Sequence, residues 1–359
     1  MNRHHYKKIV VIGLGIVISV LASLLVSAWD RKEISDPFVQ EVTTTKDAPI
    51  EVIPCGEPVG IKIQSDGVYV VGSSEIETDL GRVNLCADKI LKGDRIYSIN
   101  NQALNSKDEL KTIIEQSGNK PLDILLKRGN MKEEIIITPV YSIDEATYKL
   151  GLWVKDGTQG IGTITYINPK NGMFGALGHG IMDAELKTLI ALKNGEITKA
   201  QITSITKGKK GVPGQLGGAI EDTKAGKLGV ITLNTSIGIY GKLDGRDFTS
   251  RYGQALPIAY QDEINQGPAQ VLINLDGNAV KSYNAVIQKV ARYSTEPSKG
   301  LVIKIIDPEL LEQTNGIIQG MSGSPIVQKG KLVGAITHVF VNDPSRGYGI
   351  FIENMLAVE

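Results

Sequence analysis

The fold of this chain is decided by Gly320-Met321-Ser322-Gly323-Ser324-Pro325 and the short strand Ile326-Val327 that follows. Glycines on both sides of Ser322 let the backbone turn tightly, so that neighbouring N–H groups point at one spot. The N–H groups of Gly320 and Ser322 would stabilise a negatively charged oxygen there, beside the Ser322 hydroxyl. A hydrolase elbow of the Gly-x-Ser-x-Gly type is disfavoured, because a proline-led strand follows this loop instead of a helix. Ser322 is the candidate nucleophile, with Ser324 as its competitor in the same loop.

The region around this loop is a succession of strand patterns without a long amphipathic helix. The patterns recur at residues 160–167, 229–233, 269–275, 301–306 and 332–340. This spacing predicts a mainly β fold, as an antiparallel barrel or sandwich. The Ser322 loop resembles the nucleophile loop of chymotrypsin-like serine proteases, which implies an antiparallel double β-barrel over residues 148–359.

A serine nucleophile needs a base, and the chain has only four histidines. His4 and His5 precede an apolar N-terminal segment, so His179 and His338 are the candidates. His179 lies among small residues in the stretch 174–181, which leaves room for a substrate. His338 lies within an apolar strand, where a histidine is more often a core residue. The order His, Asp, Ser of chymotrypsin-like proteases favours His179.

An acidic residue between His179 and Ser322 is expected to orient the imidazole. Asp307 ends the apolar strand 301–306 just before Pro308, and a carboxylate at the end of a buried strand can reach into a cleft. Spacing alone leaves three rivals: Asp183, Asp262 and Asp276.

The stretch from residue 51 to 140 predicts a separate α+β domain. Two strands are expected around a turn at 65–67, and Ser106 with Glu109 forms a capping box at the start of a helix. This order of elements resembles a PDZ domain, which binds a peptide as a strand added to an open edge. By position, Gly60 and Ile61 would form the loop that receives the peptide's carboxylate.

Acidic residues complicate that expectation. Glu75, Glu77 and Asp79 make the surroundings of the groove more acidic than a carboxylate acceptor usually is. An internal segment or the protein's own chain therefore remains open as the ligand.

The N-terminus predicts export. An apolar run over residues 9–29 follows Arg3, Lys7 and Lys8, and its length suffices to cross a bilayer. The positive-inside rule places residues 1–8 in the cytoplasm and the rest across the membrane. A cleaved signal peptide is the alternative, with a small-residue site at 26–28. A polar tether is expected over residues 30–50.

Composition excludes several classes of protein. Lys and Arg number 39 and Asp and Glu number 39, so a nucleic-acid binder with a basic excess is not expected. Two cysteines are too few for a disulfide scaffold or a four-cysteine zinc site. Cys55 and Cys86 could pair or be buried separately. No metal or cofactor is expected, and a metal-dependent hydrolase using His179 and His338 lacks metal-ligand spacing.

Three phrases make the resemblance specific. They are Ala176-Leu177-Gly178-His179-Gly180, the Ser322 loop and the stretch 334–344. Together with the order of anchor, PDZ domain and peptidase, they are similar to the stage IV sporulation protein B family of endospore-forming bacteria. The resemblance implies the triad His179, Asp307 and Ser322, with Thr337 and His338 near the site.

The same resemblance implies a biological role. The chain would be a signalling protease that is exported into the space between the forespore and mother-cell membranes. It would cleave itself and a membrane-bound regulator of an intramembrane protease, which would trigger sigma factor activation in the mother cell. A non-catalytic PDZ scaffold is the alternative function.

Met321 marks a departure from trypsin-like enzymes. An aspartate before the nucleophile would pair with an N-terminal ammonium created by zymogen cleavage, whereas methionine cannot. Activation is therefore expected to work by another route, such as release of the PDZ domain or the tether.

Overall fold

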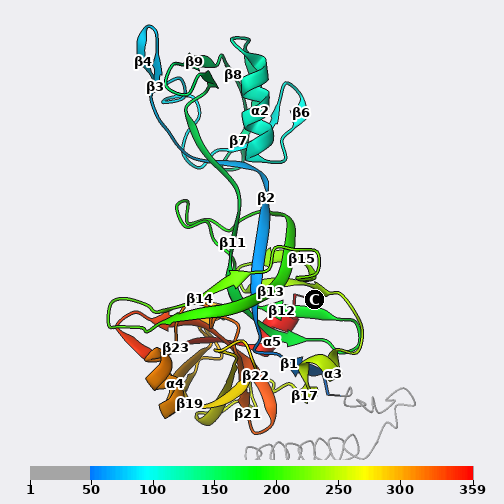
Figure 1. Cartoon of the computed structure of the whole chain (residues 1–359). Helices are drawn as coiled ribbons and strands as arrows, with labels where there is room; N and C mark the ends of the chain where they lie inside the picture. The colour runs from blue at the N-terminus through cyan, green and yellow to red at the C-terminus, as the bar shows by residue number, and fades with distance from the viewer. Residues whose placement is uncertain (1–48, 359) are drawn as a thin grey trace, which may run out of the picture. The chain divides into compact units, whose positions relative to one another are not determined.

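The structure is a computed structural model that describes residues 49–358 (Figure 1). The expected anchor over 9–29, and the expected tether as far as residue 48, lie outside the described residues. Among the helices that are described, none is both long and apolar enough to cross a bilayer. The N-terminal anchor therefore stays a prediction.

The small α+β module contains one helix and a set of short strands. It uses the second part of β2 (Pro58–Ser73) together with β3 (Ile76–Thr78), β4 (Gly81–Val83), β5 (Arg95–Ile99), β6 (Gln102–Ala103), α2 (Lys107–Ser117), β7 (Leu122–Arg128), β8 (Met131–Ile137), β9 (Val140–Ser142) and β10 (Thr147–Lys149). Its central strands run antiparallel in the order β2-β5-β7-β8. Leu110 and Ile114 of α2 pack with Ile96 and Ile124 in one buried core.

The start of α2 follows the sequence pattern. The Ser106 hydroxyl accepts a hydrogen bond from the Glu109 N–H at 3.1 Å, which confirms the predicted N-cap. The Glu109 carboxylate reaches back to the N–H of Asn105 at 2.7 Å, one residue before the cap. The Ser106 half of the predicted capping box is thus formed, whereas Glu109 bonds to Asn105 and not to the N–H of the cap residue itself. Leu110 is placed on the core side of the helix.

The first barrel is a ring of six antiparallel strands. The ring runs through β2, β11 (Leu152–Ile167), β12 (Met173–Ala176), β16 (Gly238–Leu243), β15 (Lys227–Thr235) and β13 (Leu192–Thr206). Pairing between β2 and β11 closes it. Around this ring lie β1 (Glu51–Pro54), β14 (Gln215–Ile220), β17 (Leu256–Pro257) and α3 (Phe248–Tyr252).

The second barrel is also closed and antiparallel. Its strands are β18 (Gly267–Ile273), β19 (Lys281–Val290), β20 (Leu301–Ile305), β23 (Asp343–Phe351), β22 (Lys331–Phe340) and β21 (Pro325–Gln328). Three short helices accompany it: η1 (Pro297–Lys299), α4 (Pro308–Thr314) and α5 (Ile352–Leu356). Two six-stranded barrels are the arrangement that the chymotrypsin-like resemblance implies, so the mainly β double-barrel expectation is confirmed.

Strand β2 corrects the expected position of Gly60 and Ile61. The predicted turn at 65–67 lies inside one continuous 16-residue strand. Its first part belongs to the first barrel, where Ile61 pairs with Ile197 of β13 and Gly160 of β11. A Cβ at Gly60 would lie 2.5 Å from Thr198 Oγ1, so glycine is needed for close strand packing. Gly60 and Ile61 therefore form no carboxylate-binding loop of the small module.

The edge of β2 within the module is also paired. Val70 lies opposite Val154 and Ser73 opposite Leu152, both on β11. The chain's own β11 thus occupies an edge that an added peptide strand would use. Beside it, a groove of about 610 Å³ is lined by residues that include Leu110, Tyr148 and Trp153.

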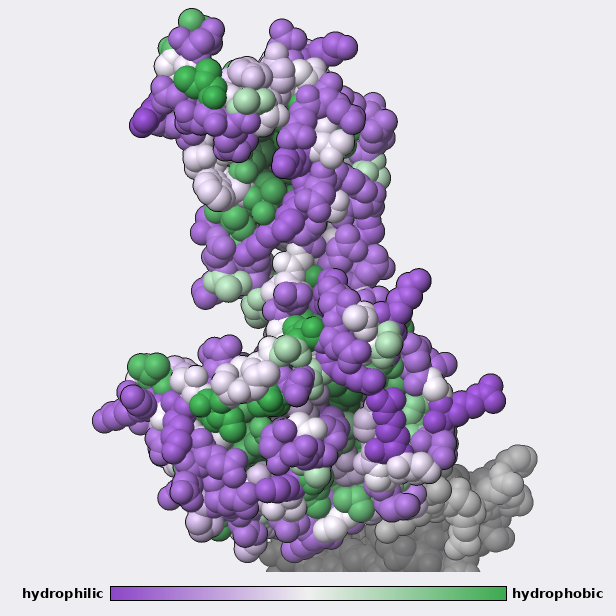
Figure 2. Space-filling view, viewed as in Figure 1, coloured by the Kyte–Doolittle hydropathy of each residue, from purple (hydrophilic) through white to green (hydrophobic). Residues whose placement is uncertain are grey.

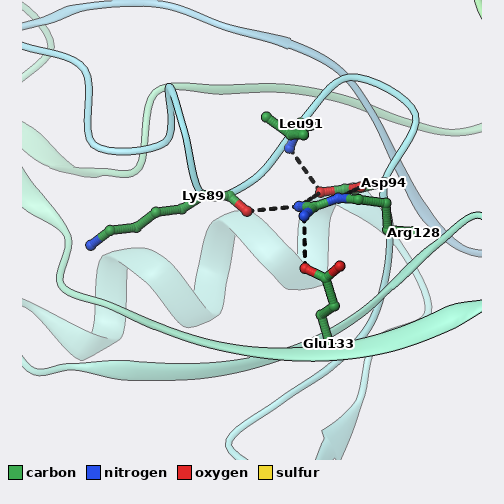
Figure 3. A network of polar contacts seen from close by, with 5 residues as sticks. All are labelled: Lys89, Leu91, Asp94, Arg128 and Glu133. Carbon is green, nitrogen blue, oxygen red and sulfur yellow. Dashed lines mark hydrogen bonds and ion pairs between the residues drawn. The ribbon is translucent and has the colours of Figure 1, made fainter.

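An ion pair between a buried aspartate and a half-buried arginine holds one turn of the module (Figure 3). Asp94 is 1% exposed and receives two hydrogen bonds from Arg128, at 2.9 and 2.7 Å. The Leu91 N–H donates to the same carboxylate, while Arg128 also donates to the Lys89 carbonyl and pairs with Glu133. This bidentate arrangement fixes the turn 91–94 against the β7–β8 hairpin.

One face of the molecule is mostly polar. Figure 2 shows hydrophilic residues over most of one face and apolar residues in smaller patches. Cys55 and Cys86 are both buried and unpaired, in separate apolar cores. Of the two alternatives for the cysteines, the structure therefore has separate burial.

Candidate active site

Two glycines give the nucleophile loop its shape. Gly320 and Gly323 have φ angles of +99° and +97°, a region that favours glycine. A Cβ on Gly323 would lie 2.1 Å from the Thr163 carbonyl oxygen, so no larger residue fits there. The Gly323 N–H donates to the Ile336 carbonyl at 2.8 Å, which ties the loop to β22.

The structure distinguishes the two serines of this loop. Ser324 is 0% exposed, and its hydroxyl has no hydrogen-bond partner. Ser322 lines a cleft, and its hydroxyl donates to the Thr337 carbonyl at 2.7 Å. A buried hydroxyl cannot attack a bound peptide, so the geometry favours Ser322 over Ser324.

Thr163 holds the nucleophile loop by donating hydrogen bonds to two backbone carbonyls of that loop. Its hydroxyl donates to the Gly320 carbonyl at 2.7 Å and its N–H to the Ser322 carbonyl at 3.2 Å. Within residues 49–358, no hydrogen bond engages the N–H of Gly320 or of Ser322. These two N–H groups thus have no partner in the described chain, and their role as an oxyanion hole stays a prediction.

His179 follows two residues with positive φ, Leu177 and Gly178. A Cβ on Gly178 would meet the Thr337 side chain at 2.8 Å, so this approach to β22 requires glycine. His179 Nδ1 lies 2.9 Å from the Gly180 carbonyl oxygen. Burial lowers the pKa of His179, although the Gly180 carbonyl acts in the opposite direction. The imidazole is therefore neutral at neutral pH and can act as a base.

Both expected near-site residues lie at the same cleft. The His338 ring centroid is 4.9 Å from that of His179. Partial burial lowers the pKa of His338 to about 4, with smaller effects of His179 and Lys299 in the same direction. The Thr337 hydroxyl donates to the Ser298 carbonyl at 2.7 Å, while its own carbonyl receives Ser322.

Asp307 does not have the role that the sequence predicts. It is the N-cap of α4 and accepts hydrogen bonds from the N–H groups of Glu309 and Leu310. Its other oxygen accepts from the Asn284 backbone and side chain at 3.1 and 3.3 Å. These four donors occupy the carboxylate, which does not line the cleft of His179. The expectation that Asp307 orients the imidazole is therefore wrong for this structure.

None of the rival carboxylates replaces Asp307. Asp183 pairs with Lys155, and Asp276 accepts a hydrogen bond from the Asn278 N–H. Among the described residues, Asp183, Asp262 and Asp276 make no hydrogen bond to His179. The group bonded to Nδ1 is a backbone carbonyl, which carries no side-chain signal in the sequence.

The cleft has a volume of about 840 Å³ and receives residues from both barrels. Gly160, Leu177 and His179 contribute from the first barrel, and Gly320 and Ser322 from the second. His179, Ser322 and Gly320 thus line one solvent-accessible space. Over residues 49–358, no group of three or more His, Cys, Asp or Glu side chains could hold a metal ion.

Solved structures provide three comparisons. The HtrA-type protease AlgW with a tripeptide is 14% identical, over 56% of this chain and 55% of that one, with a TM-score of 0.34. The active form of the Rv3671c protease from M. tuberculosis is 13% identical, over 56% of this chain and 74% of that one, with a TM-score of 0.30. The chain thus spans about half the length of the AlgW chain.

The third structure is a PDZ domain. It is the PDZ domain of the SdrC-like protein Lmo2051 from Listeria monocytogenes, 25% identical over 26% of this chain and 90% of that one, with a TM-score of 0.22. A comparison with curated proteins finds no match.

The family comparison covers most of the double barrel. The family model described as SpoIVB peptidase S55 matches residues 146–356, more than half of the 359-residue chain. The match includes His179, Ser322 and every residue that lines their cleft except Ile61. The resemblance to the stage IV sporulation protein B family is confirmed. The chain belongs to the SpoIVB peptidase S55 family and is a serine endopeptidase.

Proposed function

We propose that Ser322 is the nucleophile of this endopeptidase, that His179 is its base, and that the N–H groups of Gly320 and Ser322 form the oxyanion hole. One observation carries the proposal: both side chains line one cleft beside two N–H groups that have no partner within the described chain. Acyl transfer needs these three elements around one carbonyl group.

The tautomer of His179 follows from its neighbour. A carbonyl oxygen can only accept, so Nδ1 carries the proton that binds Gly180, and Nε2 is left as the acceptor. The Ser322 hydroxyl turns about its Cα–Cβ bond from the Thr337 carbonyl towards Nε2. Its proton passes to Nε2 as the oxygen bonds to the peptide carbonyl carbon, and the N–H groups of the hole bind the resulting oxyanion.

Collapse of this intermediate completes the first half of the reaction. The C–N bond breaks as the His179 imidazolium gives its proton to the leaving amine. Water then attacks the acyl group on Ser322, with His179 as base again, and releases the acid. A carbonyl dipole from Gly180 stabilises the imidazolium less than a carboxylate would. This difference favours a slow enzyme.

For the substrates, we propose the chain itself and a membrane-bound regulator of an intramembrane protease. Family membership and the predicted anchor over 9–29 support this proposal. The anchor would place the double barrel in the space between the forespore and mother-cell membranes, close to a membrane-bound substrate. Cleavage of the regulator would then trigger sigma factor activation in the mother cell.

The test compares the full-length chain with Ser322→Ala. Each protein is incubated in detergent micelles, and the N-termini of its fragments are sequenced. Only the wild type is expected to produce fragments, whose ends report the processing sites. Identical fragments from Ser322→Ala would contradict the proposal. Terminal labelling of a sporulating membrane fraction should reveal new termini on one membrane protein with the wild type only.

A further inference from the structure

A loop beside the cleft is organised by one buried carboxylate. We call residues 180–190 the wall loop, because Gly180, Ile181 and Met182 line the cleft. Asp183 is 6% exposed, and its Oδ1 accepts hydrogen bonds from the N–H groups of Glu185 and Leu186 at 2.9 and 2.8 Å. The Asp183 carboxylate thus fixes the outer part of the wall loop, directly after Met182.

The two ends of the wall loop are held together by Asn234, independently of Asp183. The Asn234 side chain accepts from the Ile181 N–H at 2.9 Å and donates to the carbonyls of Ile181 and Ile190 at 3.0 and 2.9 Å. Because these Asn234 hydrogen bonds lie next to His179 in the sequence, the position of the His179 imidazole does not depend on Asp183. Changes at Asp183 should therefore act on the cleft wall and leave Ser322 and His179 in place.

Lys155 binds the wall loop from outside it. Its Nζ lies 2.8 Å from Asp183 Oδ2 and 3.3 Å from Glu185 Oε1. Burial lowers the pKa of Lys155, but the hydrogen bonds and charges of these two carboxylates outweigh it and raise the pKa overall. Lys155 lies on β11 opposite Tyr69 of β2, where the two strands run on into the small module.

The small module adds a second contact. Lys92 Nζ lies 3.9 Å from Glu185 Oε2. Lys92 belongs to the turn 91–94, which the Asp94–Arg128 ion pair holds in shape (Figure 3). Two cations from outside the wall loop therefore converge on Asp183 and Glu185.

We propose that Lys155 is a positioning residue, which acts through Asp183 to hold the wall loop and its Met182 against a bound peptide. The inference rests on the proposed function, since it assigns the cleft to a peptide substrate. Strands β2 and β11 connect the small module to the first barrel, and Lys155 lies on β11. Under this proposal, the position of the small module also affects the affinity of the cleft for a peptide substrate.

The experiment uses full-length Lys155→Met, which removes the charge and keeps the apolar stem. Two readouts separate the wall from the chemistry. One readout is the rate of labelling by a small alkyl fluorophosphonate. The other is kcat and KM for a fluorogenic peptide, which is first identified as a substrate by screening a mixture of peptide sequences with the wild-type enzyme. We expect KM to rise about tenfold, with the labelling rate within about twofold of wild type.

Control variants make the result specific. Lys155→Arg keeps the charge and should restore KM. Lys227→Met removes a matched ion pair, which Lys227 makes with Glu196 at 2.7 Å in the first barrel, and should behave as the wild type. A wild-type KM for Lys155→Met would overturn the positioning role, and so would an equal rise in KM for Lys227→Met. Either result would leave the proposed serine chemistry unaffected. Absence of labelling and cleavage in a folded wild type would overturn the proposed function and this inference with it.

Discussion

The substitution Asp307→Asn distinguishes a helix cap from a catalytic acid. As the N-cap of α4, Asp307 accepts hydrogen bonds from Glu309 and Leu310 at 3.1 and 3.3 Å. Asparagine caps helices about as well as aspartate, because its one side-chain oxygen accepts the bonds from Glu309 and Leu310. Its amide nitrogen cannot accept the two bonds from Asn284, but Asn284 is exposed and water can replace them. We therefore expect the free energy of unfolding to fall by at most about 0.5 kcal/mol and the rate of fluorophosphonate labelling to stay within about twofold.

The substitution Asp307→Ala sets the scale for loss of the cap. Removing the N-cap side chain costs about 1 kcal/mol. Asn284 also loses its acceptor, but this residue is exposed and water can replace the bond, so the added cost is about 0.5 kcal/mol. We expect a total of about 1–2 kcal/mol in the free energy of unfolding, with labelling preserved under conditions where the protein is folded.

The two roles of Asp307 predict very different kinetics for the asparagine variant. An amide in place of an orienting carboxylate leaves the histidine in the wrong tautomer and lowers kcat by about 10⁴-fold. Denaturant unfolding and labelling rates are measured on the same preparations. A variant Asp307→Asn that folds with wild-type stability but labels more than about a thousandfold more slowly would refute the assignment of Asp307 as a cap alone.

Three further predictions concern the cleft and its loop. Because burial lowers the pKa of His179 and a base must be neutral, the labelling rate should be full at neutral pH and fall through a midpoint below the ordinary value of 6.5; a midpoint above it would count against this base. Ser324→Ala removes a buried hydroxyl without a partner, so labelling should persist and the free energy of unfolding should stay equal or rise by up to about 1 kcal/mol; loss of labelling in the folded variant would show that Ser324 is the nucleophile. Gly323→Ala would force a Cβ to 2.1 Å from the Thr163 carbonyl at a φ of +97°, so labelling should be lost at a cost of at least about 1–3 kcal/mol in stability, and a wild-type rate would contradict the loop geometry.

The sequence predicts those parts of the site whose signal is local. Glycines around Ser322 and before His179 are required by the backbone itself, through positive φ angles and close approach to neighbouring strands. The helix that begins after Ser106 is predictable for the same reason, because its cap lies within a few residues of sequence. The alternation of strands likewise predicts a mainly β double barrel.

The parts that depend on long-range pairing are not predictable in this way. A strand pattern is the same whether its partner is β5 of the module or β13 of the barrel. The pattern alone therefore places Gly60 and Ile61 in the module, whereas their pairing places them in the barrel. Asp307 precedes a proline and ends a strand, which suits both a helix cap and an orienting acid. Only the arrangement in space shows that α4 uses the carboxylate.

Contacts made by backbone groups cannot be predicted from the residue types in the sequence. His179 contacts the backbone carbonyl of Gly180, and Ser322 donates to that of Thr337. Every residue has such a carbonyl, whatever its side chain, so neither partner can be identified from residue type. Thr163 contributes its hydroxyl and its N–H to the nucleophile loop, yet it is one residue in an ordinary strand pattern. Functional partners of this kind follow from the fold alone.

Mapping the covalent adduct tests the central claim most directly. The full-length chain is reacted with a fluorophosphonate, digested and analysed by mass spectrometry, beside His179→Ala. We expect one modified residue, Ser322, and a labelling rate that falls by at least about a hundredfold without the imidazole. An adduct on Ser324, or an adduct on Ser322 that forms as fast in His179→Ala as in the wild type, would contradict the account.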